Sequence, residues 1–320
     1  MHLPDFKNSV GVPDVPLDFR DFWDRQLSLE STIPIDFERT PDSAMDTDTH
    51  TVEWIRFLSF NGEHIFGWLA TPRSALGHVH RGLVWLPGYS YGNPKPGPDT
   101  LYPDTVTLGL NVHGNTPDYP YEHPRRLGGE YITEGITSPE TYIYRRIVLH
   151  CIHAVTVLKQ LPEVQSDRIV VGGMSQGGGL ALIVAALRLD VAACLADMPW
   201  LCNLTLALSL IDPDRYPIGR PGPDSRARIR ELAQLDPKEG PAIYRTFSYF
   251  DPLSHADQMV CPVDMSAGGK DPSCRAPTIY SVYNRLPVEK NMLYLGDTGH
   301  QIVPEMHTSH SRWVDCHVPI

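Results

Sequence analysis

A glycine-rich segment at residues 173–179 places a serine hydroxyl where it could act as a nucleophile. The segment reads GMSQGGG, follows the β-branched run Ile169-Val170-Val171 and precedes small apolar residues. In a sharp turn from strand to helix, the positions that flank the serine leave no room for a Cβ, so glycines are required there. The helix would point its positive end, with the backbone N–H of Gln176, at the Ser175 hydroxyl. We therefore predict a nucleophile elbow with Ser175 at its apex.

The serine needs a base and an acid, because a hydroxyl is a poor nucleophile near neutral pH. With such an elbow, the expected order along the chain is serine, acid, histidine, with the last two in loops after late strands. Asp271 follows an apolar strand and a Gly-Gly turn, and His300 follows a glycine in the loop after the last predicted strand. We predict that Ser175, Asp271 and His300 form a catalytic triad for ester hydrolysis through an acyl-enzyme.

Three other side chains compete for the roles of acid and base. Asp264 is an alternative acid, but it stands inside the strand, where we expect it to make a structural contact. His307 and His310 are alternative bases, but both fall in the predicted final helix, from which the serine is harder to reach. As donors to the oxyanion we predict the backbone N–H groups of Gln176 and of Tyr89, which lies in the loop after an early strand.

The sequence gives no sign of a metal or cofactor site, so we expect neither. His78 and His80 flank a valine, and His150 and His153 lie one helical turn apart. Neither pair has a third ligand in a recognisable pattern. The six cysteines form no CxxC pair and most of them stand in apolar runs, which favours buried free thiols.

Charge and hydropathy limit the possible partners. The chain has 38 acidic and 27 basic side chains, a net charge of −11, and no basic cluster, which argues against a nucleic-acid partner. No apolar run reaches the roughly 18 residues of a membrane span. The first residues, MHLPDFKNSV, lack a basic flank followed by an apolar core, so we expect no signal peptide and a cytoplasmic location.

Alternating apolar strands and helices predict one α/β domain with a mainly parallel sheet that helices cover on both faces. Asn61-Gly62 separates two β-rich runs and predicts a hairpin. Segments 92–104 and 114–139 are rich in Gly, Pro and Tyr and predict long surface loops. Residues 139–161 carry apolar positions at helical spacing.

Two segments stand outside this alternation. Residues 1–50, rich in Pro and Asp, are predicted to be an N-terminal extension with one amphipathic helix near residues 18–30. Residues 203–250 combine Pro, Arg and Asp with short helical stretches. We interpret this second segment as a small cap inserted between core elements.

The elbow occurs together with other short segments. These are Asp21-Phe22-Trp23-Asp24, Gly88-Tyr89, Pro199-Trp200-Leu201-Cys202, Ser248-Tyr249-Phe250-Asp251, Tyr283-Asn284 and Gly299-His300. With this set the chain resembles the acetyl xylan esterase and cephalosporin C deacetylase family, carbohydrate esterase family 7. The resemblance implies an α/β-hydrolase fold, the triad and oxyanion donors named above, and removal of acetyl groups from small substrates. It also implies a homo-oligomer, a cytoplasmic hexamer.

The chain departs from the family pattern at three places. The family usually has Arg-Gly-Gln where this chain has His113-Gly114-Asn115, Glu where it has Gln301, and a His-Gly-Tyr-like turn where it has Pro87-Gly88-Tyr89. The first change removes a guanidinium fork, which affects loop packing and the preference for acyl group or alcohol. The alternatives are therefore an esterase for another acyl chain or alcohol and, more remotely, an inactive binding protein.

Overall fold

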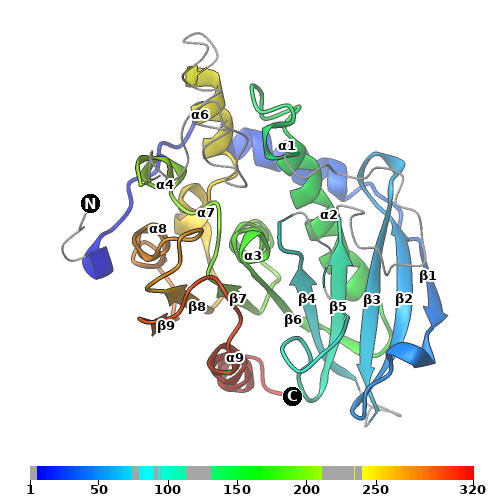
Figure 1. Cartoon of the computed structure of the whole chain (residues 1–320). Coiled ribbons are helices and arrows are strands. Elements are labelled where there is room, and N and C mark those ends of the chain that lie inside the picture. Colours follow the sequence, from blue (N-terminus) through cyan, green and yellow to red (C-terminus); the bar gives the residue numbers. More distant parts are fainter. Residues whose placement is uncertain are drawn as a thin grey trace.

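A single β-sheet forms the centre of the molecule. The computed structural model describes residues 6–73, 79–89, 93, 95–112, 131–210, 234 and 240–320. Within these residues nine strands pair in the order β1-β2-β3-β5-β4-β6-β7-β8-β9 (Figure 1). The strands are β1 (Phe37–Pro41), β2 (His50–Leu58), β3 (His64–Pro72), β4 (His80–Leu86), β5 (Thr105–Asn111), β6 (Val164–Met174), β7 (Ala193–Asp197), β8 (Val263–Gly268) and β9 (Lys290–Leu295).

The sheet is parallel from β5 to β9 and antiparallel from β1 to β5. Strands β4 and β5 are buried at every position, as expected for parallel strands covered on both faces. Strands β2 and β3 form the predicted hairpin, and Asn61 (φ 59°) and Gly62 (φ 72°) supply the left-handed residues of its turn. The prediction of a mainly parallel sheet is therefore confirmed.

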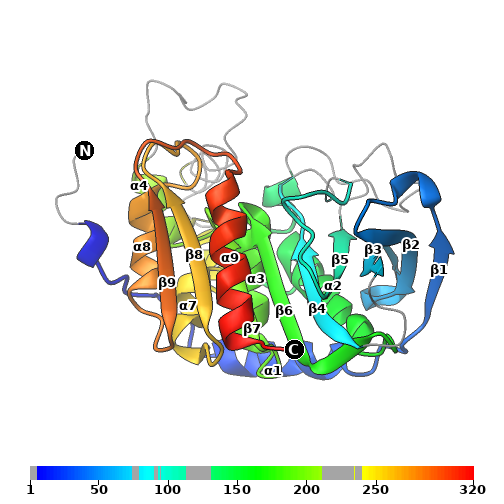
Figure 2. The ribbon, with the colours of Figure 1, turned by 90° about the horizontal axis from the view of Figure 1, so that it is seen from below.

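Helices cover both faces of the sheet. The helices in the described residues are α1 (Phe19–Glu30), α2 (Ile143–Leu158), α3 (Gln176–Leu187), α4 (Leu204–Ser209), α6 (Gly240–Ser248), α7 (Pro252–His255), α8 (Ala276–Tyr283) and α9 (Pro304–His317), of which α4 and α6 lie in the predicted cap. Side chains of β4 alternate between the faces, because successive residues of a strand point in opposite directions. Leu83 and Trp85 pack with Val314 of α9, whereas Val84 and Leu86 join the core around α2 and α3. Figure 2 shows α9 in front of the sheet.

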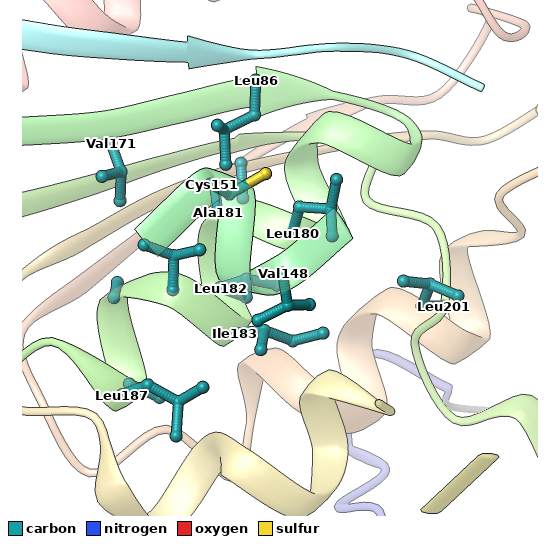
Figure 3. Packing of buried hydrophobic residues seen from close by; sticks show 14 of the residues in the cluster. Leu86, Val148, Cys151, Val171, Leu180, Ala181, Leu182, Ile183, Leu187 and Leu201 are labelled. Carbon is teal, nitrogen blue, oxygen red and sulfur yellow. The ribbon is translucent and has the colours of Figure 1, made fainter. Parts of the chain in front are cut away.

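Helix α3 lies at the centre of the larger core. All of its residues are buried, which fits a helix that is apolar on every side. Figure 3 shows Leu180 and Ile183 of α3 among Val148 and Cys151 of α2 and Leu86 of β4. This packing fixes the N-terminus of α3, and with it the elbow that precedes the helix.

The N-terminal segment contributes more to the core than the sequence suggests. The predicted helix is confirmed as α1, and its Phe22 and Trp23 are buried. Strand β1, which we did not predict, pairs with β2 at the edge of the sheet. Its sequence, FERTP, is mostly polar because an edge strand can expose one side, and edges tolerate charge and proline.

Other expectations are corrected or lie outside the described residues. Residues 131–139 belong to a predicted surface loop, but Tyr131 and Ile132 are buried, so this prediction is wrong for them. Five cysteines are buried, as predicted, whereas Cys316 is exposed. The predicted cap contains α4 and α6, and its residues 211–233 and 235–239 lie outside the described chain, as do 113–130. No described helix has both the length and the apolar character required to cross a bilayer.

Candidate active site

The elbow forms where β6 meets α3. Ser175 adopts φ 60° and ψ −121°, a conformation that costs energy for a residue with a side chain. Backbone hydrogen bonds hold it there: Ser175 N–H donates to the Asp197 carbonyl over 2.9 Å, and Trp200 N–H donates to the Ser175 carbonyl over 2.8 Å. The end of β7 and the segment after it therefore fix the turn that presents the serine hydroxyl.

The glycines of the elbow are sterically required. A Cβ at Gly173 would lie 2.6 Å from the backbone carbon of Gly177, and a Cβ at Gly177 would lie 2.3 Å from the carbonyl oxygen of Leu86. The second contact shows how closely the end of β4 approaches the N-terminus of α3. This close approach brings the predicted oxyanion residues together.

Asp271 and His300 meet at the carboxyl ends of the parallel strands, in the loops after β8 and β9. His300 Nδ1–H donates to Asp271 Oδ2 over 2.7 Å. Asp271 Oδ1 accepts from the backbone N–H groups of Ser273 (2.7 Å) and Cys274 (2.8 Å), so both carboxylate oxygens have donors. The Asp271 side chain is fully buried, whereas the His300 side chain is 25% exposed. This arrangement orients the imidazole and leaves its other nitrogen available for chemistry.

Backbone hydrogen bonds join the two loops that carry this pair. Gly269 N–H donates to the Leu295 carbonyl over 2.8 Å, and Lys270 N–H donates to the Thr298 carbonyl over 3.0 Å. An exposed ion pair between Lys270 and Asp297 also connects the loops. The position of the histidine is therefore coupled to that of the acid through the main chain.

Cys274 lies between the serine and the acid–histidine pair, a placement that the sequence analysis missed. Its Sγ is 4.0 Å from Ser175 Oγ. One ligand atom from each of Cys274, Asp271 and His300 lies within 4.8 Å of the other two. The hydroxyl thus faces the thiol in this structure, and no hydrogen bond joins Ser175 directly to His300 among these described residues. Catalytic hydrogen bonds are often looser before substrate binds.

The side chain of Gln176 connects the two predicted oxyanion donors. Its Nε2 donates to the carbonyl oxygens of Pro87 and Gly88, each over 3.3 Å, directly before Tyr89. Its Oε1 accepts hydrogen bonds of 2.6 Å from the hydroxyls of Tyr131 and Tyr144. Burial raises the pKa of the Tyr144 phenol well above its ordinary value, so the hydroxyl keeps the proton that it donates. Sequence reasoning did not find either tyrosine.

Two of the three rejected candidates for acid and base, Asp264 and His310, bind one another. His310 Nδ1–H donates to Asp264 Oδ2 over 2.8 Å, and its Nε2–H donates to Asp197 Oδ2 over 2.9 Å. His307 Nε2 lies 3.0 Å from the Leu101 carbonyl, and its ring stacks on Tyr102. The expected structural contact of Asp264 is therefore confirmed, and its partner is the rival base.

The histidine pairs considered for metal binding have other contacts. His150 Nδ1 lies 2.7 Å from Ser59 Oγ, and His153 Nδ1–H donates to Glu30 Oε1 over 2.8 Å. His80 is buried, and His78 lies outside the described residues.

Over the described ranges, one group brings three potential metal ligands together: Asp271, Cys274 and His300. Both oxygens of Asp271 and Nδ1 of His300 are already used in hydrogen bonds with each other or with the backbone. The donor set is therefore arranged for positioning the imidazole, which suits acid–base chemistry better than metal coordination.

The sequence matches a known protein family over almost its whole length. A sequence model of the acetyl xylan esterase family, AXE1, matches residues 1–317. The chain belongs to the acetyl xylan esterase family. The architecture is the α/β-hydrolase fold, as predicted.

Relatives of this acetyl xylan esterase family member include a curated protein, acetyl esterase Axe7A of Xylanibacter ruminicola. It is 24% identical over 309 residues, which cover 93% of this chain but only 66% of that protein. The solved acetyl xylan esterase from Paenibacillus sp. R4 is 25% identical, with a TM-score of 0.84 over 99% of this chain and 100% of that one. Acetyl xylan esterase 1 from Thermoanaerobacterium sp. JW/SL YS485 is 22% identical, with a TM-score of 0.82 and 98% coverage of both chains.

Of the departures from the family pattern, two can be placed. Tyr89 is partly buried, and its ring stacks on Tyr131 at a centroid distance of 4.6 Å. Gln301 is exposed beside His300. His113-Gly114-Asn115 lies outside the described residues.

Proposed function

We propose that this protein removes acetyl groups from small substrates, such as acetylated xylo-oligosaccharides or cephalosporin C, through a triad of Ser175, His300 and Asp271. The observation that carries the proposal is the 2.7 Å hydrogen bond between His300 and Asp271, at the sheet edge that also bears the strained elbow. Membership of the acetyl xylan esterase family supports an acetyl ester as the substrate.

The reaction begins when the Ser175 hydroxyl turns from Cys274 towards Nε2 of His300. The imidazole accepts the hydroxyl proton as the oxygen attacks the acetyl carbonyl carbon. Asp271 keeps the other proton on Nδ1, so that Nε2 is the basic nitrogen, and stabilises the imidazolium that forms.

The negative oxygen of the tetrahedral intermediate lies between the loop after β4 and the N-terminus of α3. The backbone N–H groups of Tyr89 and Gln176 donate to it, each contributing about 3–4 kcal/mol to transition-state stabilisation. His300 then protonates the leaving alcohol, which leaves an acetyl-enzyme on Ser175. A water molecule releases acetate by the same steps.

Replacing the nucleophile tests this proposal. We expect Ser175→Ala to lower kcat for p-nitrophenyl acetate and for acetylated xylo-oligosaccharides by at least about 10⁴-fold. A fluorophosphonate probe should label the native protein but not this variant. Ser28→Ala, at an exposed hydroxyl of α1, is the control and should keep both properties. Substantial hydrolysis or labelling of folded Ser175→Ala would refute the assignment.

Assembly and location form a further part of the proposal. The family resemblance supports a homo-oligomer, with six subunits, in the cytoplasm. Light scattering after gel filtration should give a mass of about six subunits, and the mass of a single subunit at micromolar concentration would contradict this.

A further inference from the structure

A cavity of about 330 Å³ opens beside Ser175. This volume lies at the lower end of the range of small-molecule sites, about 300–1,000 Å³. It corresponds to the space of about ten water molecules in the liquid. An acetyl group carries a single methyl beyond its carbonyl and would leave most of this space unfilled. The cavity therefore has room for a larger part of a substrate.

The wall of the cavity is mainly apolar. Trp85 and Leu86, at the end of β4, and Met174, directly before the nucleophile, form its inner part. Ile302, two residues after His300, lies at the outer part and is 48% exposed. A group held here would thus lie directly next to the reacting centre.

The polar groups of the wall already have partners or lie at the opening. Asn93 Nδ2 donates to the Trp85 carbonyl, and Thr100 Oγ1 donates to the Gly97 carbonyl over 3.3 Å. Lys95 and Asp99 also line the cavity, but both are exposed. Polar groups that are paired within the protein offer little to a sugar hydroxyl, whereas the apolar wall would gain from covering a hydrocarbon group.

We propose that this cavity is a subsite for an apolar substituent of the ester, an alkyl chain or an aromatic ring. The inference rests on the proposed function, because the substituent is placed by the attack of Ser175 on the ester carbonyl. The substituent belongs either to the acyl group or to the alcohol, and burying each of its CH₂ groups contributes about 0.8 kcal/mol. The preferred substrates then carry a hydrocarbon group in addition to the ester bond.

Two substrate series distinguish the acyl side from the alcohol side. The first compares p-nitrophenyl acetate, butyrate and hexanoate, and the second compares ethyl, hexyl and 3-phenylpropyl acetates, whose leaving alcohols are all alkyl alcohols of similar acidity. In at least one series, we expect kcat/KM to rise about tenfold from the smallest ester to a larger one, which corresponds to about 1.4 kcal/mol.

Gly97→Phe would fill the cavity. A Cβ at Gly97 has its nearest neighbour, the Lys95 carbonyl oxygen, at 3.9 Å, so the first atom of a side chain fits there without a clash. We expect the ratio of kcat/KM for the preferred larger ester to that for its smallest homologue to fall about tenfold. Ile302→Ala removes part of the wall from an exposed position and should lower the same ratio about threefold.

Leu189→Ala is the matched control for Ile302→Ala. Leu189 is also an exposed aliphatic residue, 69% accessible, but it follows the C-terminus of α3, about 18 Å along the helix from the elbow. The ratio of kcat/KM for the larger ester to that for the smallest ester should be the same in Leu189→Ala as in the native protein. Active enzyme with flat profiles in both series, or with ratios unaffected by Gly97→Phe and Ile302→Ala, would overturn the subsite. A native protein that hydrolyses no acetyl ester would instead overturn the proposed function.

Discussion

At the scale of single residues, the Asp271 carboxylate has a specific set of donors. Two backbone N–H groups bind Oδ1, and His300 Nδ1–H binds Oδ2. An asparagine can satisfy the two backbone donors only with its carbonyl oxygen, so its NH₂ group must face the imidazole. This would force Nδ1 to accept and move the ring proton to Nε2, the wrong tautomer for a base. We expect Asp271→Asn to lower kcat for p-nitrophenyl acetate by about 10⁴-fold, with the fold intact.

Asp297→Asn provides the control for this change. Asp297 is an exposed carboxylate on the loop that carries His300, paired with Lys270 across the surface. Its replacement removes the same charge from nearly the same place without touching the imidazole, so kcat should stay within about twofold because exposed pairs contribute little. If Asp271→Asn retained more than a tenth of native kcat, the tautomer argument would fail.

The same scale shows which site residues a sequence can reveal. Ser175, Asp271 and His300 were predicted because chain order and flanking glycines constrain where each must stand. Cys274 carried a weaker signal: it follows Asp271 by three residues, the spacing at which a backbone N–H can bond an aspartate side chain. Tyr131 and Tyr144 carried none, since only the folded chain brings α2 and the preceding turn to Gln176.

At the scale of elements, the Gln176 side chain ties α3, the loop after β4 and α2 together. Tyr144→Phe removes one of its two hydroxyl donors and leaves the packing of the ring unchanged. The lost hydrogen bond corresponds to about 1 kcal/mol of stability. If the bond also holds the two proposed oxyanion donors in register, kcat for p-nitrophenyl acetate should fall by about fivefold with little change in KM.

Tyr142→Phe is the matched control. Tyr142 is a neighbouring tyrosine that is equally buried, yet its hydroxyl has no hydrogen-bond partner in the described part of the chain. Removing this hydroxyl should leave kcat unchanged and should not lower the free energy of unfolding. Equal effects of the two substitutions on kcat would show that packing, not the contact with Gln176, matters at these positions.

Elements whose apolar residues form a run or repeat at regular spacing could be predicted from the sequence. Elements that depend on pairing or packing with another part of the chain could not. Strands β4 to β9 and helices α1, α3 and α9 show apolar runs or helical spacing in the sequence itself. Strand β1 lacks such a run because only its partner β2 makes it a strand. Residues 131–139 resemble a loop in composition, and their burial depends on the tertiary packing of Tyr131 and Ile132.

At the scale of the whole molecule, His310 connects α9 to the centre of the sheet. Burial of the imidazole alone would lower its pKa, but the carboxylates of Asp197 and Asp264 outweigh burial and raise the pKa to about 10. Since this pKa exceeds that of the unfolded state, about 6.5, the stabilisation is complete below pH 6.5 and is lost as pH rises through about 10. Removing one partner from such a buried group costs about 3–5 kcal/mol. We expect His310→Gln to lower the free energy of urea-induced unfolding by this amount at pH 6.5.

The pH dependence of this difference separates a charge effect from a packing effect. Between pH 7 and 10 the free-energy difference between the native protein and His310→Gln should shrink steadily, because the imidazole of the unfolded chain has lost its proton whereas the folded protein keeps it up to about pH 10. His255 is the contrasting case: it is also buried, and burial lowers its pKa to about 4, so it stays neutral throughout this range in both folded and unfolded states. His255→Gln should therefore give a difference that does not vary with pH. A constant difference for His310→Gln as well would mean that α9 is held by packing alone, and that the protonated imidazole between the two carboxylates contributes nothing.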